Sequence, residues 1–142
     1  MTEVKIYQET FGTDTTGQGF TDITEQVSAI VKRSKIKTGL CTVFIQHTSA
    51  SLIIQENADP AVQRDLARWM AALVPESDAW EHIEEGPDDM PSHVRTMLTR
   101  TSEMIPIQAA RLALGRWQSL YLWEHRREAR TRFIIVQITG VA

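Results

Sequence analysis

The chain has 142 residues, of which 42% are hydrophobic and 23% are charged, and its formal net charge is −3. This size and composition are typical of one globular domain spanning residues 1–142. The weakly negative charge gives no reason to expect binding to nucleic acid or to an anionic membrane. No apolar run reaches the length of a membrane span, and no signal-peptide segment opens the sequence. The single Cys41 excludes an internal disulfide and a cysteine zinc cage, so we expect a cytoplasmic protein.

The first third of the sequence predicts two strands around a short helix. Val4–Phe11 alternates in character and is expected to be an edge strand, whereas Gly12–Gly19 is rich in Gly, Thr and Asp and is expected to be a turn. Thr24 is the expected cap of the helix, and Gly39 is the expected end of that unit. Leu40–His47 then alternates again, as a half-buried strand does.

A second helix is the clearest element of the sequence. It follows a short buried run, Leu52–Ile54, which predicts another strand. Asp59 is placed to cap the helix and Pro60 occupies its first position, where a missing N–H costs nothing. Apolar residues then recur at helical spacing and predict one buried face, formed by Val62, Leu66, Trp69, Met70 and Leu73.

The second half of the chain predicts one more short helix and three strands. The helix is expected to open at Asp89 and to run through Leu98. Glu103–Ile107 is a predicted strand, which Pro106 confines to an edge or a bulge. Trp117–His125 and Thr131–Thr139 are the last predicted strands. This order of elements predicts an α+β fold, a compact single-domain sandwich of antiparallel or mixed sheet with two or three helices.

Three of the four histidines lie in polar runs where predicted strands end or helices begin. They are His47, His93 and His125. Side chains converge at such ends, and metal binding or catalysis needs a neutral imidazole held beside a carboxylate. A single histidine of this kind is more often a hydrogen-bonded core or rim residue than a ligand, and their spacing matches no zinc signature. We nevertheless expect the three to share one pocket.

Two metal arrangements fit these residues. Carboxylates such as Asp88 and Asp89 can hold Mg²⁺ against phosphate oxygens, or the three imidazoles can bind one divalent metal with an open position. The second arrangement is the one we favour. The neighbouring hydroxyls, Thr48, Ser49 and Ser51, serve either as turn caps or as ligand contacts.

Five runs of the sequence together resemble the YjbQ-like family, also called the secondary thiamine-phosphate synthase family. The resemblance keeps the family's motif order from Val4 to Gly140. It departs at Arg116 and Ser119, where the family commonly has Thr and Gly, and this puts the substrate in doubt more than the fold. The runs are Gln46–Leu52, Glu56–Pro60, Glu85–His93, Gly115–Gln118 and Glu124–Arg126.

The resemblance implies a homotrimer with a histidine site near subunit contacts. It also implies a weak thiamine-phosphate synthase activity, in which a pyrimidine pyrophosphate and a thiazole phosphate join with loss of pyrophosphate. The alternative is a non-catalytic trimeric protein that binds a small ligand or metal, or serves as a scaffold. The motifs and the resemblance together assign the catalytic residues His47, Glu56, Asp88, Asp89 and His93, the phosphorylated-ligand contacts Thr48, Ser49, Ser51, Asn57 and Arg126, and the Zn or Mg ligands His47, His93 and His125.

Overall fold

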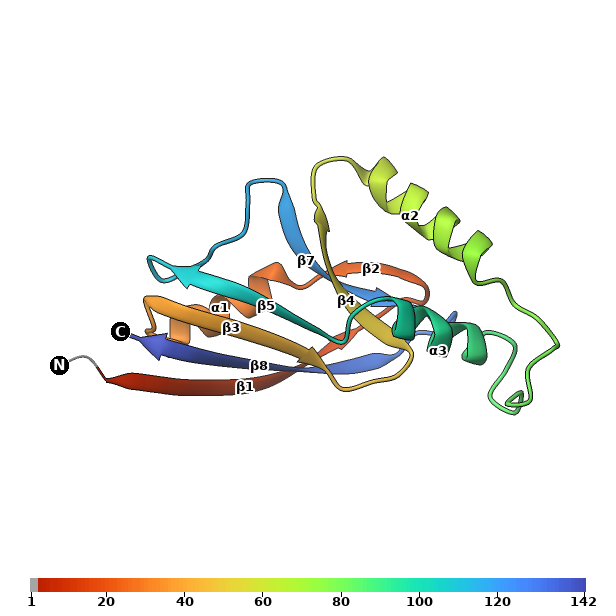
Figure 1. The fold of residues 1–142 in the computed structure, drawn as a ribbon, viewed down its shortest axis with the longest axis horizontal. Coiled ribbons are helices and arrows are strands. Elements are labelled where there is room, and N and C mark those ends of the chain that lie inside the picture. The colour runs from red at the N-terminus through yellow and green to blue at the C-terminus, as the bar shows by residue number, and fades with distance from the viewer. Residues whose placement is uncertain (1–2) are drawn as a thin grey trace.

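The computed structural model describes residues 3–142 and confirms the α+β fold. Within these residues, eight strands form two antiparallel sheets, and three helices accompany them (Figure 1). The larger sheet has the order β1 (Val4–Asp14), β8 (Thr131–Val141), β3 (Thr38–Ile45), β5 (Ser102–Gln108), β6 (Arg111–Leu112). The smaller sheet has the order β2 (Gly19–Asp22), β7 (Gln118–Glu124), β4 (Ala50–Glu56). The helices are α1 (Thr24–Ser34), α2 (Pro60–Leu73) and α3 (Asp89–Leu98).

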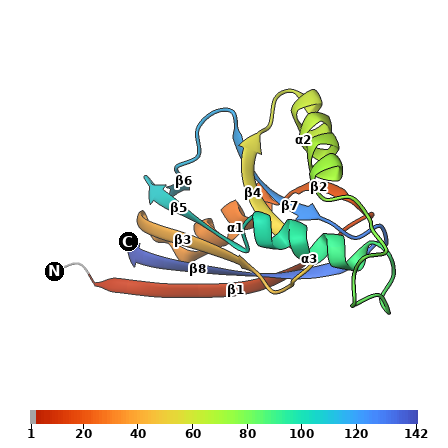
Figure 2. The same cartoon turned by 45° about the vertical axis from the view of Figure 1, so that its right-hand side comes forward.

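The main core lies between the two sheets and is closed by α1. Alternate residues of β7 divide between its two faces, so that Leu120 and Leu122 enter this core. Trp123 faces the other way and packs with Met70 and Val74 in a second, smaller cluster. Helices α2 and α3 therefore lie on the far side of the smaller sheet, as Figure 2 shows. That side carries the histidine-rich segments.

The first part of the chain confirms one prediction and corrects another. Strand β1 is an edge strand, as predicted. The expected turn at Gly12–Gly19 is too long, because β1 pairs with β8 as far as Asp14 and β2 begins at Gly19. The polar composition of this segment concealed a paired strand end, whose hydrogen bonds come from β8 and not from local turn chemistry.

The expected boundaries of α1 are wrong at both ends. Ile23 is the N-cap and provides no side-chain hydrogen bond, while the Thr24 hydroxyl accepts from Leu120 N at 2.9 Å and so ties the helix to β7. The helix ends at Ser34, followed by Lys35 in the left-handed conformation. Gly39 belongs to β3, where a Cβ would collide with the backbone of Thr139 and Gly140. Glycine is needed there for close strand approach, not for a helix end.

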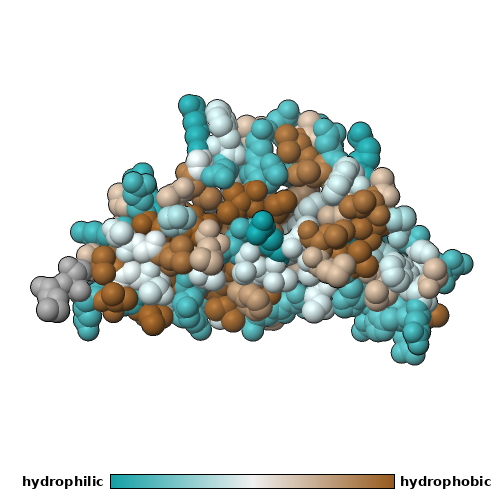
Figure 3. Space-filling view, viewed as in Figure 1, coloured by the Kyte–Doolittle hydropathy of each residue, from teal (hydrophilic) through white to brown (hydrophobic). Residues whose placement is uncertain are grey.

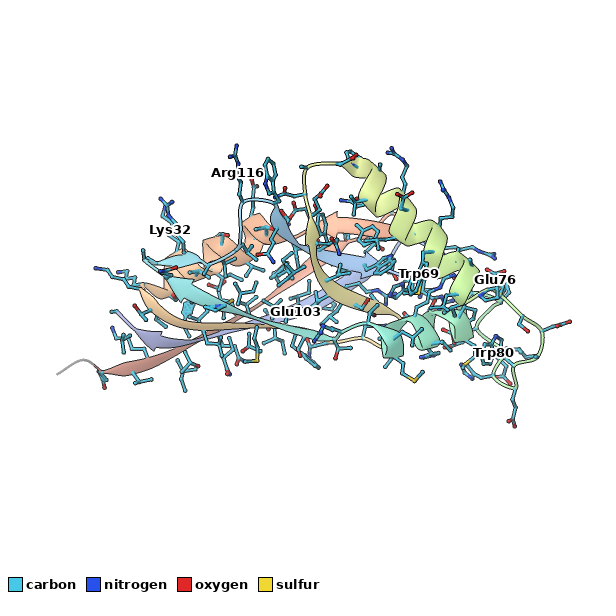
Figure 4. All side chains as sticks on the ribbon, turned by 45° about the horizontal axis from the view of Figure 1, so that its top comes forward. Lys32, Trp69, Glu76, Trp80, Glu103 and Arg116 are labelled. Atoms are coloured by element: carbon cyan, nitrogen blue, oxygen red, sulfur yellow. The ribbon has the colours of Figure 1, made fainter. Side chains whose placement is uncertain are left out.

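Helix α2 begins as predicted, but its buried face is narrower than its apolar stripe. Asp59 accepts a hydrogen bond from Ala61 N at 2.9 Å, and Pro60 is the first residue. Met70 is the one buried residue of this helix, whereas Trp69 and Leu73 are 60% and 51% exposed. Figure 4 shows Trp69 near the end of α2 that leads into the loop before α3. An apolar stripe indicates a face that favours burial, but not what covers it.

The remaining elements follow the sequence closely. Strand β6 pairs with Ile107 and Gln108 alone, so β5 is an edge strand at Pro106, as predicted. Strand β7 begins at Gln118 and ends at Glu124, which leaves Trp117 and His125 just outside it. Among residues 3–142, no helix combines the length and the apolar character that a membrane crossing requires.

Candidate metal centre

Two histidines and two acids converge where the loop before α3 meets that helix. One ligand atom from each of His82, Glu85, Asp89 and His93 lies within 4.8 Å of all the others. The Nε2 atoms of His82 and His93 are 3.0 Å and 3.2 Å from Asp89 Oδ2, and His82 Nε2 is 3.3 Å from Glu85 Oε2. The cluster is open on one side, because His82 and Glu85 are exposed while Asp89 is buried.

Local sequence explains how the four side chains meet. Asp89 and His93 are four residues apart on α3, and this spacing places them on one face of a helix. His93 lies one turn after Asp89 on this helix. Gly86, with φ of 106°, allows the loop to turn back, so that His82 and Glu85 approach the helix start. Figure 4 shows Glu76 and Trp80 marking this loop at one end of the molecule.

Arg126 fastens the loop to the end of β7. Its Nε donates to Asp88 Oδ2 at 3.1 Å, its Nη1 to Asp89 Oδ1 at 2.9 Å, and its Nη2 to the Glu85 carbonyl at 2.8 Å. Burial alone would raise the pKa of Asp88, but hydrogen bonds from the Arg127 N–H and from Arg126 outweigh it and hold that pKa below its usual value. Asp88 is therefore a carboxylate anchored to the protein through Oδ2.

Asp89 differs from Asp88 because its second oxygen, Oδ2, is buried without a hydrogen bond from the described residues. Oδ1 is held by Arg126, but Oδ2 is buried and accepts no hydrogen bond within the described part of the chain. The ring nitrogens of His82 and His93 are near it without the alignment of a hydrogen bond. Nitrogen and oxygen atoms of four side chains that lie within 4.8 Å of one another are grouped as metal ligands are.

The protonation of His82 bears on this cluster. Its hydrogen bond with Glu85 raises the pKa of His82; burial opposes this change, and the Asp89 carboxylate adds to it. A metal ion would need the neutral imidazole and would compete with that proton.

His47 sits in the loop after β3, in a second polar network. Its Nδ1 accepts from Ser49 N at 3.1 Å and lies 3.0 Å from Ser49 Oγ. The Ser49 hydroxyl also accepts from Arg132 Nη2 at 2.9 Å. Arg132 in turn donates to the Glu124 carboxylate at 2.8 Å and 2.6 Å. Glu124 accepts from the backbone N–H of Arg126. This bond joins the network of His47 to Arg126, whose side chain holds the loop before α3.

His125 is buried between β4 and α3. Its Nε2 is 2.8 Å from Ser51 Oγ, and its carbonyl accepts from Ser92 Oγ at 3.0 Å. Burial, followed by the charges of Arg95 and Arg132, lowers the pKa of His125 to about 3. His125 is therefore neutral and its Nε2 is paired with Ser51, while its Nδ1 is buried with no hydrogen-bond partner among the described residues.

The structure thus brings together part of the residue set expected from the sequence. Asp88, Asp89, His93 and Arg126 meet at the loop, whereas His47 and His125 direct ring nitrogens to Ser49 and Ser51. Thr48 is exposed on the loop. Two other expected site residues lie at the junction of β4 and α2. The Glu56 carboxylate accepts from Asp59 N at 3.2 Å, and Asn57 donates to Ser119 Oγ at 3.1 Å.

His82, Glu85 and Arg132 were not recognised as site residues from the sequence. His82 lies in a run of acids, with Glu85 three residues later, and this local pairing of imidazole with carboxylate was the available signal. Arg132 carried no such signal, since it sits within a β-branched strand and meets Glu124 and Ser49 through the fold alone.

The fold and this site define a small α+β protein with a histidine and carboxylate centre at one end of a two-sheet core. Residues 9–141 match the family described as UPF0047 protein YjbQ-like, and the chain belongs to that family. It is 52% identical to the UPF0047 protein sll1880 of Synechocystis, over 94% of this chain and 92% of that protein. It is 36% identical to the UPF0047 protein YjbQ of Escherichia coli, over 94% and 98%.

Solved structures show the same fold. A YbjQ-like protein of unknown function from Sulfolobus solfataricus superposes with a TM-score of 0.88 at 27% identity, covering 97% of this chain and 99% of that one. A conserved hypothetical protein from Thermus thermophilus gives 0.78 at 32% identity, covering 89% and 97%.

Proposed function

We propose that the protein binds one divalent cation through His82, Glu85, Asp89 and His93. The observation that carries this proposal is Asp89 Oδ2, a buried carboxylate oxygen with no donor among the described residues and two imidazole nitrogens 3.0 Å and 3.2 Å away. A buried charged oxygen without a partner is costly, and a cation would satisfy it. Arg126 holds the other oxygen and so fixes the carboxylate.

The donor set favours zinc over magnesium. Magnesium prefers oxygen ligands and keeps several waters, whereas zinc combines imidazole and carboxylate ligands at short distance. Exposed His82 and Glu85 leave the cluster open toward solvent, where a ligand can approach. A bound cation would supply positive charge for an anionic group there.

We propose a small phosphorylated molecule as that ligand. The reaction implied by the family resemblance is thiamine-phosphate synthesis: the bond from the pyrimidine methylene carbon to pyrophosphate breaks, and the thiazole nitrogen bonds to that carbon. Pyrophosphate leaves with the electron pair, so charge stabilisation on phosphate oxygens is what the site must provide. Arg127, whose half-exposed guanidinium pairs with Glu76 beside the loop, adds a positive charge near this end of the molecule.

We also propose a homotrimer. Large apolar side chains are exposed outside the core, among them Met97 (75%), Met104 (60%) and Phe133 (54%). Figure 3 shows apolar areas near α3 and beside β4 on one face of the chain. Exposed apolar area of this kind marks association surfaces. Light scattering should give a trimer mass at micromolar concentration, and a monomer mass would contradict the proposal.

Metal analysis tests the cation site. Protein purified without a histidine tag should retain about one zinc per chain. His93→Ala and Glu85→Gln should each lower zinc affinity by about 100-fold or more, since loss even of groups behind the ligands costs 10–100-fold. Glu84→Gln is the matched control, because it removes an exposed acid next to Glu85 that is outside the cluster. Equal losses in Glu84→Gln and Glu85→Gln would contradict the assignment.

Catalysis needs a separate test. Metal-loaded protein is incubated with the pyrimidine pyrophosphate and the thiazole phosphate, and product and released pyrophosphate are measured. Turnover that fails in Glu85→Gln supports the transferase. Stoichiometric zinc without turnover would favour the non-catalytic alternative.

A further inference from the structure

A hydrogen bond from Ser49 determines which ring nitrogen of His47 carries the proton. The backbone N–H of Ser49 points to His47 Nδ1 at 3.1 Å. A backbone N–H donates and never accepts, so Nδ1 must be the unprotonated nitrogen. In a neutral imidazole the other nitrogen then carries the hydrogen. The nitrogen of His47 that remains available for a ligand is therefore an Nε2–H group.

The surroundings keep this tautomer in place. Ser49 is 2% exposed, and its hydroxyl accepts from Arg132 Nη2 at 2.9 Å. Its carbonyl accepts from His125 N at 3.2 Å, and Arg132 is held by both oxygens of Glu124. The loop that presents the Ser49 N–H is thus fastened to β8 and to the end of β7, and His47 cannot exchange its ring nitrogens without losing that bond.

The imidazole of His47 is also kept neutral. Burial and then Arg132 lower the pKa of His47; Arg130 and His93 act in the same direction and Glu124 opposes them. Ser49, which bonds this ring, accepts from His125 N through its carbonyl, and the His125 carbonyl accepts from Ser92, the residue before His93 on α3. Hydrogen bonds therefore join His47 to the helix that carries the metal cluster. A neutral Nε2–H has no lone pair to offer a metal, but it is a hydrogen-bond donor.

We propose that His47 is a ligand-binding donor, whose Nε2–H bonds an oxygen of the phosphorylated molecule held at the metal centre. Ser49 and Arg132 are positioning residues that set its tautomer. This inference rests on the proposed function and removes His47 from the metal ligands expected from the sequence. Phosphate oxygens accept such a bond, and a donor from beyond the metal cluster distinguishes phosphate esters from ligands that bind the metal alone.

Nitrogen NMR of histidine-labelled wild-type protein, without metal, tests the tautomer directly. The His47 signals are assigned by their loss in His47→Gln. The expected result is a protonated Nε2 and an unprotonated Nδ1 at pH 7.5. The opposite tautomer would overturn the proposal, and this readout stands whether or not the protein binds zinc.

Binding of inorganic pyrophosphate, with and without zinc, tests the role. His47→Ala should weaken pyrophosphate binding by about 10- to 100-fold, as expected for a hydrogen bond to a charged group, while zinc content stays unchanged. His47→Gln places an amide N–H near the position of Nε2 and should recover most of the affinity. His47→Asn is too short to do so and should behave as His47→Ala.

Three outcomes would overturn the proposal. Loss of zinc in His47→Ala would make this residue a metal ligand. Unchanged pyrophosphate affinity in His47→Ala would leave it no ligand contact. Equal affinity in His47→Gln and His47→Asn would show that the Nε2 position is not the donor. If wild-type protein takes up no zinc, the proposed metal function fails, and the same variants measured without metal still decide the role of His47.

Discussion

Two buried arginine–carboxylate groups lie at the same end of the molecule and differ in how completely they are paired. Arg132 and Glu124 bond through both carboxylate oxygens, and backbone N–H groups and Thr15 saturate the rest. Arg126 also holds a buried acid, Asp89, but through one oxygen, and the other faces two histidines. The Arg132–Glu124 group, the saturated one, is structural, whereas the Arg126–Asp89 group, the unsaturated one, has an oxygen that can still bind a ligand.

The difference teaches that burial of charge alone does not indicate function. Both groups are almost completely enclosed, with Glu124 1% and Asp89 2% exposed. What separates them is the count of donors around each oxygen, since a buried charged atom without a partner is costly and is retained where something binds it.

Breaking the saturated group should have the largest effect. Glu124→Ala leaves the Arg132 charge buried and unpaired, so we expect the free energy of unfolding in urea to fall by about 3–5 kcal/mol. Asp65→Ala is the control, because the Asp65–Arg68 pair is exposed at 3.9 Å and should contribute less than about 0.5 kcal/mol. Similar losses of unfolding free energy in both variants would show that the Arg132–Glu124 pair does not stabilise this end of the molecule.

The unsaturated group should respond through the metal and not through the fold. Asp89→Asn keeps an oxygen for Arg126 but weakens the second ligand position. We expect zinc affinity to fall by about 100-fold, or about 2.7 kcal/mol, measured by competition with a chelator. The unfolding free energy without metal should change by less than about 1 kcal/mol. A large loss of stability with zinc affinity intact would reverse the two roles.

Acid should weaken the fold through His125. The ordinary histidine pKa is 6.5, and burial lowers the pKa of His125 to about 3. Below pH 6.5 this histidine binds a proton in the unfolded chain but stays neutral in the folded protein. The contribution of His125 to stability is therefore fully present above pH 6.5 and is lost as pH falls. Between pH 6.5 and 4.5 this contributes a loss of about 2 kcal/mol. In urea titrations at several pH values, His125→Gln should lack this slope, and equal slopes would contradict the assignment.

An exposed capping acid should matter least. Asp59 bonds Ala61 N at the start of α2 and takes no part in either buried group. Asp59→Ala should lower the unfolding free energy by about 1 kcal/mol and leave zinc affinity unchanged. Asp59→Asn, which retains an acceptor oxygen, should recover most of that stability, and failure to do so would argue against the cap.

The parts of the fold that the sequence predicted well depend on local signals. The Asp59–Pro60 start of α2 needs no distant partner, and the alternation of β3 and β8 reports their own buried faces. Strand β2, with four residues, exists through its pairing with β7, about a hundred residues later. The exposure of Trp69 could not be predicted either, because it depends on how far α2 stands from the sheet.

The candidate site divides in the same way. Asp89 and His93 were each singled out as polar residues where a helix begins, and the structure adds that their four-residue spacing brings the two side chains together. His82 joins them through a loop that the Arg126 guanidinium holds by a hydrogen bond to the Glu85 carbonyl, 41 residues away in sequence. No local sequence pattern predicts a contact of that range. His47 was singled out as the polar end of a strand, but β3 ends two residues earlier, at Ile45, and the tautomer of His47 depends on the Ser49 N–H, which only the folded structure shows.

The two glycines that face each other across β3 and β8 have a consequence for how the larger sheet assembles. Gly39 is paired directly with Gly140, and a Cβ on either would run into the backbone of the other strand. Shifting β8 by one residue would bring Thr139 or Val141 opposite Gly39, and a side chain would then occupy space that holds backbone. The glycine pair therefore fixes the register of β3 and β8, because only the alignment that places Gly39 opposite Gly140 avoids a steric clash.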